Sequence, residues 1–135
     1  MLGAEEFLAL AREDRHSDVL KAFGRLAPSD RDKPVVMMAY GDSLYEMGED
    51  VRAIEVYLTF ANRFPRTRAA GFALYGAAMA MKNLGLMHEA LRLLESIECK
   101  ENHPELEGHL ASAEDRLEKQ SSARDLFELW NTVPR

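Results

Sequence analysis

One cysteine and four histidines are the residue types of this chain from which structural zinc sites are usually built. They are Cys99, His16, His88, His103 and His109. Their separations do not match the ligand spacing of a zinc site, and a lone cysteine cannot form an internal disulfide. His88 and Glu89 are adjacent, but adjacent residues of a helix point in different directions, so they do not form a catalytic dyad. We therefore expect no metal, no cofactor and an idle or buried thiol.

A second candidate for catalysis is the triplet Gly41-Asp42-Ser43, which also occurs in some lipid hydrolases. In those enzymes the serine follows a strand, whereas here the triplet lies in the middle of a predicted helix. We found no nucleophile beside a base and no paired carboxylates with a convincing spacing. The sequence therefore predicts a protein that is not an enzyme.

Length and charge exclude several classes of function. The 135 residues suit one domain, and 23 acidic against 17 basic residues leave a net charge of −6. Nucleic-acid binders usually carry a basic stripe, so we expect no nucleic-acid partner. No stretch approaches the roughly 20 apolar residues that span a bilayer, and residues 1–6 lack a basic region followed by an apolar run, so we expect no membrane insertion. The default is a cytoplasmic protein; a removed signal or a longer parent protein would look the same.

Apolar residues recur at intervals of three and four along the whole chain, which predicts helices almost everywhere. Ser17 is a suitable N-cap for the second helix, Pro28 would stop that helix, and residues 29–33 would form a polar loop. Eight helices are expected, at about 4–13, 18–27, 34–46, 50–63, 68–83, 87–98, 104–119 and from 121 or 122 onward.

An internal repeat organises the middle of the chain. The segment MGEDVRAIEVY at 47–57 returns 37 residues later as LGLMHEALRLL at 84–94, with glycine, alanine and the apolar positions in step. A period of about 20–50 residues indicates one supersecondary unit stacked on another. Gly48 and Gly85 would end the first helix of each unit.

These residues resemble the tetratricopeptide repeat, a helix–turn–helix unit with small residues where its helices cross. With Gly48 on the inter-helix glycine of the family, the other matched positions are Gly41, Leu44, Ala53, Tyr57 and Pro65. With Gly85 on that glycine, they are Leu74, Ala78, Met81, Ala90 and Leu94. The longer spacing between units is similar to that of repeat proteins of the bacterial cell envelope, so a periplasmic location stays open.

The resemblance implies an all-α fold, a right-handed superhelix of about three to four antiparallel hairpins within a single domain of residues 1–135. Clear repeats would cover 34–65 and 71–100, with degenerate hairpins or caps at 4–28 and 104–131, because both ends lack the inter-helix glycine. Phe127 and Trp130 would seal the last apolar face.

The resemblance also implies where a ligand would bind, because the first helices of such units line a concave groove. The groove residues would be Met38, Asp42, Tyr45, Phe72, Tyr75, Met79 and Lys82. Val35, Glu46 and Asn83 project to the same surface. Methionine and tyrosine supply adaptable apolar contact, with hydroxyls left for the backbone of a peptide. The alternative is that Met38, Phe72 and Met79 pack against terminal helices folded across the concavity.

The charges on this surface favour one kind of ligand over another. The lysine and asparagine with which chaperone-binding members of the family hold a C-terminal carboxylate are replaced by Met38 and Asp42. A ligand with apolar anchors and a basic residue facing Asp42 and Glu46 fits better. The basic cluster Arg63, Arg66 and Arg68 is typical of a solvated loop between repeats.

The sequence thus predicts a non-catalytic adaptor that binds a peptide or helical segment of a protein partner. Two alternatives remain: a structural oligomerisation domain that associates with copies of itself or a larger assembly, and a small secretion-type chaperone that holds an export substrate.

Overall fold

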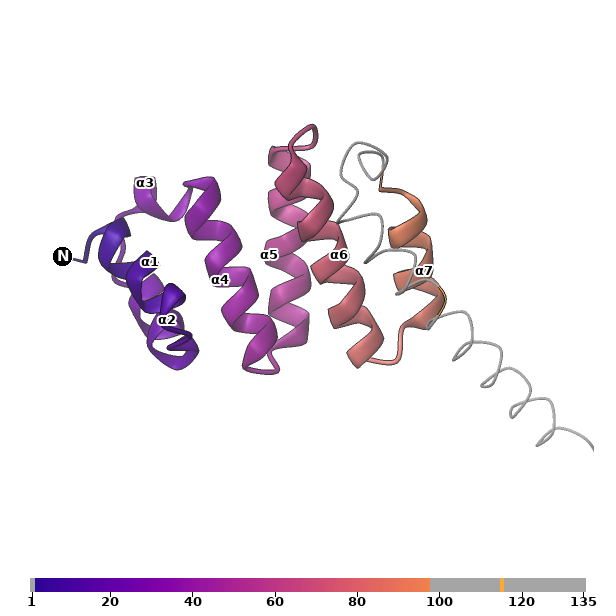
Figure 1. Cartoon of the computed structure of the whole chain (residues 1–135), viewed down its shortest axis with the longest axis horizontal. Coiled ribbons are helices and arrows are strands. Elements are labelled where there is room, and N and C mark those ends of the chain that lie inside the picture. The colour runs from indigo at the N-terminus through magenta and orange to yellow at the C-terminus, as the bar shows by residue number, and fades with distance from the viewer. Residues whose placement is uncertain (1, 98–114, 116–135) are drawn as a thin grey trace, which may run out of the picture.

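The structure, a computed structural model, describes residues 2–97 and residue 115 (Figure 1). The described residues form seven helices and no strand beyond an isolated bridge between Leu2 and Leu26. The helices are α1 (Ala4–Arg12), α2 (His16–Phe23), α3 (Pro28–Arg31), α4 (Pro34–Glu46), α5 (Asp50–Arg63), α6 (Arg68–Asn83) and α7 (Met87–Glu95).

Six of these helices form three hairpins, α1–α2, α4–α5 and α6–α7, which follow one another along the long axis of the molecule (Figure 1). Each hairpin packs on its neighbour: α4 contacts α1 and α2 on one side, and α6 contacts α5 on the other. The expected all-α, tetratricopeptide-like fold is confirmed, while the right-handed sense of the superhelix stays a prediction. The helices expected at 104–119 and beyond 121, with Phe127 and Trp130, lie outside the described residues.

The bounds predicted for α4, α5 and α6 are correct, because strong local signals mark them. Pro34 occupies the first turn of α4, where its missing N–H costs nothing. Gly48 follows α4 with φ +76°, a conformation that favours glycine. The side chain of Thr67 caps α6 by accepting a hydrogen bond from the backbone N–H of Ala70 at 3.2 Å. The α7 helix ends at Glu95, earlier than the expected residue 98.

Two expectations about the N-terminal region are wrong. Ser17 is not an N-cap: it lies inside α2, which begins at His16. The polar loop expected at 29–33 begins with a short helix instead, and Pro28 starts this helix rather than stopping α2, which ends at Phe23. The fixed φ of proline is as suitable for the first turn of a helix as for a stop, and the sequence alone did not separate the two uses.

The α1–α2 hairpin has the same turn as the two clear repeats, although it lacks the glycine. Asp14 is left-handed, with φ 56°, and is the one non-glycine residue of the described chain with a positive φ. The following N–H, of Arg15, bonds to the carbonyl of Leu10. The N–H groups of Glu49 and Leu86, after Gly48 and Gly85, make the same bond five residues back. The N-terminal hairpin therefore closes its turn with the same backbone geometry as the two later hairpins.

The ring of Tyr57 holds the central helices together. It is 3 % exposed and lies between Gly41 of α4 and Gly76 of α6. A Cβ on Gly41 would stand 3.0 Å from ring atom Cε1, and one on Gly76 would stand 2.7 Å from both Cε2 and Cζ. The tyrosine of α5 thus fills space that two glycines on neighbouring helices leave open.

The Gly76→Ala variant should lower the free energy of unfolding. Overpacking against a ring held on both sides costs about 1–3 kcal/mol, which outweighs the gain in helix propensity of about 1 kcal/mol. Urea unfolding followed by circular dichroism measures the change. Gly24→Ala is the matched control, because its Cβ would come no closer than 3.9 Å to any atom and its φ is −64°. Equal stability of the two variants would show that the ring has room to move.

The left-handed turn at Asp14 makes a second prediction. Asp14→Gly should raise the free energy of unfolding by up to about 1 kcal/mol, because glycine adopts this conformation without the Cβ conflict. Gly48→Asp should lower it by a similar amount, since a Cβ there meets no atom within 4 Å and the cost is conformational. Thermal unfolding of both variants tests the reciprocity, and a loss of stability in both would contradict the equivalence of the two turns.

Candidate peptide-binding groove

A groove of about 900 Å³ lies between α4 and α6, with α5 as its floor. We call it the α4–α6 groove. It brings together all seven predicted groove residues: Met38, Asp42, Tyr45, Phe72, Tyr75, Met79 and Lys82. The other lining residues are Pro34, Val35, Ala39, Tyr57, Phe60, Ala69 and Gly76.

The two walls of the groove repeat one helical pattern. On α4 the predicted residues are Met38, Asp42 and Tyr45, and Val35 precedes them by one turn. On α6 the set begins at Phe72 and follows the same steps of three, four and three. Such steps place side chains along a single face of a helix. This shared register explains why the family pattern, applied to the sequence, names residues on both walls.

Small residues of α4 and α6 leave room for the groove above α5. Ala39 on α4 and Ala69 and Gly76 on α6 carry one side-chain carbon or none, and the buried rings of Phe60 and Tyr57 on α5 also line the groove. The side chains that rise around the α5 floor are chiefly apolar. An apolar hollow with a few polar groups is the usual composition of a ligand site, so the arrangement suits apolar side chains of a bound segment.

Asp42 supplies negative charge at one wall, where it accepts a hydrogen bond from the Tyr57 hydroxyl at 2.5 Å. Asp42 is an exposed residue, but partial burial of its carboxyl raises the pKa above the ordinary value of 3.8; the hydrogen bond from Tyr57 opposes this rise, and the charge of Glu46 adds to it. The pKa of Tyr57 is raised as well, first by burial and then by the Asp42 charge. The phenol therefore remains a donor near neutral pH.

Sequence reasoning did not expect six of the lining residues, and it projected two residues to this surface that do not line the groove; the six are Pro34, Ala39, Tyr57, Phe60, Ala69 and Gly76. Tyr57 was expected to pack between units, and it also lines the groove; Gly76 was not singled out at all. Glu46 and Asn83 project to the concave surface but are not among the groove lining. The Asn83 amide instead donates to Asp50 at 3.2 Å. Gly76, two residues from each of the matched positions Leu74 and Ala78, was the available signal for a close contact.

The Gly41-Asp42-Ser43 triplet is structural in this fold. Ser43 is 1 % exposed, and its hydroxyl lies 2.9 Å from Nδ1 of His16. The other ring nitrogen of His16 is 3.9 Å from Asp14, beyond hydrogen-bond distance. A nucleophile so deeply buried, without an oriented base, does not fit acyl transfer. The pair instead ties α2 to α4.

Arg63 and Arg68, two of the three arginines around Pro65, contact neighbouring residues. Arg63 donates to Asp32 at 3.2 Å and approaches the sulfur of Met37, which joins α5 to the start of the second unit. The guanidinium of Arg68 lies 5.6 Å from the ring centre of Phe72. These contacts agree with the reading of the cluster as part of the connection between units.

The described residues hold neither a cluster of metal ligands nor a helix that could span a membrane. No group of three or more His, Cys, Asp or Glu residues in that part of the chain is arranged to hold a metal ion. Among its helices, none combines the length and the apolar character needed to cross a membrane.

Comparison with known proteins supports one class. A family model described as tetratricopeptide repeat matches residues 36–67, which cover most of α4, all of α5 and the turn that follows. No curated protein and no solved structure matches the chain. The match, with the row of helical hairpins, supports a tetratricopeptide-like repeat protein. Members of this family are typically non-catalytic modules of protein–protein interaction, and that general role is supported here.

The hydrogen bond between Tyr57 and Asp42 leads to a prediction about titration. In Tyr57→Phe the bond that lowers the carboxyl pKa is lost, so the pKa of Asp42 should rise further. Carboxyl chemical shifts followed by NMR over an acid pH series measure it. Tyr45→Phe is the control, since it removes a hydroxyl from the same groove and not the one bonded to Asp42. An Asp42 pKa that is unchanged in Tyr57→Phe would contradict the assigned bond.

The same titration affects stability with a defined sign. Because the folded pKa of Asp42 is raised, the folded state binds this proton more tightly than the unfolded state does. The contribution of Asp42 is therefore most favourable below pH 3.8 and is lost as the pH rises through the folded pKa. Tyr57→Phe should extend this loss to higher pH.

Proposed function

We propose that the chain is a non-catalytic adaptor that binds a segment of a partner protein, extended or helical, in the α4–α6 groove. The observation that carries the proposal is the meeting of all seven predicted residues in one apolar hollow. A hollow of this size suits a few side chains of a peptide rather than a flat protein surface.

The chemistry of the walls supports a peptide as the ligand. Met38 and Phe72 are partly exposed, so they offer apolar surface that a ligand would cover. Tyr45 is also partly exposed and carries a hydroxyl suited to backbone groups. Met79 is 9 % exposed and adds an adaptable apolar side chain to the α6 wall of the groove. Apolar anchors with a few hydrogen bonds are the usual means of binding a short segment.

The proposal is tested with the variant Tyr45→Ala/Tyr75→Ala and a random peptide library displayed on phage. Peptides selected on the wild-type chain should bind the variant about thirtyfold more weakly, because two interface tyrosines each contribute about 1 kcal/mol or more. Fluorescence anisotropy of labelled peptides measures the affinity, and helical circular dichroism should be retained.

Val51→Ala/Leu86→Ala is the matched control for this experiment. It also truncates two exposed apolar residues, 58 % and 41 % exposed, but neither lines the groove. Peptide binding should be unchanged in this variant. Equal losses in both variants, or none in the tyrosine variant, would assign the peptide to another surface.

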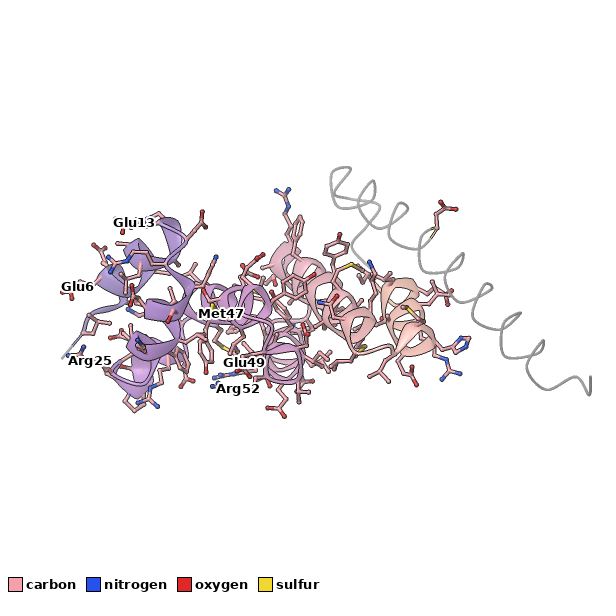
Figure 2. All side chains as sticks on the ribbon, turned by 90° about the horizontal axis from the view of Figure 1, so that it is seen from below. Glu6, Glu13, Arg25, Met47, Glu49 and Arg52 are labelled. Atoms are coloured by element: carbon pink, nitrogen blue, oxygen red, sulfur yellow. The ribbon has the colours of Figure 1, made fainter. Side chains whose placement is uncertain are left out.

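A structural oligomerisation domain is the second candidate, favoured by exposed apolar residues near the turns that end α4 and α6. These are Met47, Val51, Leu84 and Leu86. Figure 2 places Met47 with Glu49 and Arg52 at the first of these turns. Sedimentation at several concentrations separates the candidates: a chain that stays monomeric excludes self-assembly as the main role, and association that Val51→Ala/Leu86→Ala abolishes would support it.

A further inference from the structure

A second hollow, of about 870 Å³, adjoins the α4–α6 groove on the side of the N-terminal hairpin. We call it the α1–α4 pocket. Residues of α1, the turn after it and the start of α2 form one wall, and α4 forms the other. The two hollows share the lining residues Val35, Ala39, Asp42, Tyr45 and Tyr57. The two hollows therefore adjoin at α4, and a segment lying in the groove could extend into the pocket.

The charge of this pocket differs from that of the groove. Three carboxylates line it, from Asp14, Asp42 and Glu46, against one guanidinium, from Arg12. Asp42 and Glu46 stand one turn apart on α4, where like charges repel each other. The imidazole of His16, also on the lining, is held by Ser43. The pocket is thus negative in balance, on a chain whose net charge is −6.

The class of cation follows from the arrangement of these carboxylates. They do not form a metal-holding group within the described residues. The pocket is large enough for a long side chain, and its apolar members Leu8 and Ala11 suit the methylene stem of a lysine or arginine. An ammonium or guanidinium at the end of such a stem would reach carboxylates from two units of the repeat.

We propose that the α1–α4 pocket binds a lysine or arginine side chain of the same partner segment whose apolar residues occupy the α4–α6 groove. This inference rests on the proposed function of the groove. The segment then lies with its apolar part toward α6 and its basic residue toward α1, with Asp42 at the boundary. The N-terminal hairpin, which lacks the glycine of the repeat, is in this view a recognition element and not a cap.

The test begins with the peptide library selected on the full chain. Lysine or arginine should be enriched to one side of the apolar positions in the selected peptides. One such peptide and its norleucine counterpart are then titrated against the wild-type chain and Asp14→Asn/Glu46→Gln. On the wild-type chain the norleucine exchange should weaken binding by up to about fivefold, the upper end for an ion pair at exposed carboxylates, because the Asp14 side chain is 87 % exposed and Asp42 and Glu46 are exposed as well. On the variant the exchange should make little difference.

Glu5→Gln/Glu95→Gln is the control, since it removes the same charge from exposed residues that line neither hollow. Its response to the norleucine exchange should equal that of the wild-type chain. Apolar peptides without a basic residue, or an equal loss on Asp14→Asn/Glu46→Gln, would overturn this inference and leave the groove standing. Peptides that bind the Tyr45→Ala/Tyr75→Ala variant as well as the wild-type chain would overturn the groove, and the pocket with it.

Discussion

The contact on which the central part of this structure depends is the Tyr57 ring between Gly41 and Gly76. It joins α5 to the first helix of its own unit and to the first helix of the next, so a single side chain sets how closely α4 and α6 approach. Because the ring is nearly buried and held on both edges, it has little freedom to adjust. Its hydroxyl, bonded to Asp42, links this packing to the charge of the groove.

The groove also depends on small side chains on neighbouring helices. Helix α6 buries alanines at 70, 73, 77, 78 and 80, which let it lie close to its neighbours. The groove lies where α4 and α6 face each other across α5. Small residues leave space there, and larger side chains at steps of three and four line its two sides. Stability and binding thus draw on adjacent positions of the same helices, and a change at Tyr57 would alter both.

The sequence predicted the middle of the chain better than its beginning, for physical reasons that particular residues illustrate. Pro34, Gly48 and Thr67 act locally, through a fixed φ, a positive φ and a cap, so the bounds of α4 to α6 could be predicted. The residues of the groove walls were implied by the family resemblance, and helical register explains why both walls have the same spacing. Ser17 and Pro28 were misassigned because each residue type suits more than one position near a helix end. The hydrogen bond from Tyr57 to Asp42 joins α5 to α4 across a sequence separation of 15 residues. Only the packing of these two helices brings the partners together.

The N-terminal hairpin closes with the same turn as the later hairpins although it has no glycine between its helices. A search for the inter-helix glycine passes over Asp14, and the family model matches one unit, at residues 36–67. The backbone nevertheless closes all three turns with the same hydrogen bond to the residue five positions back. What the turn requires is a left-handed conformation, and aspartate tolerates it better than most side chains do. An aspartate at this position also brings a carboxylate to the α1–α4 pocket, which glycine could not do. Asp14 therefore contributes both to the turn and to the charge of the pocket.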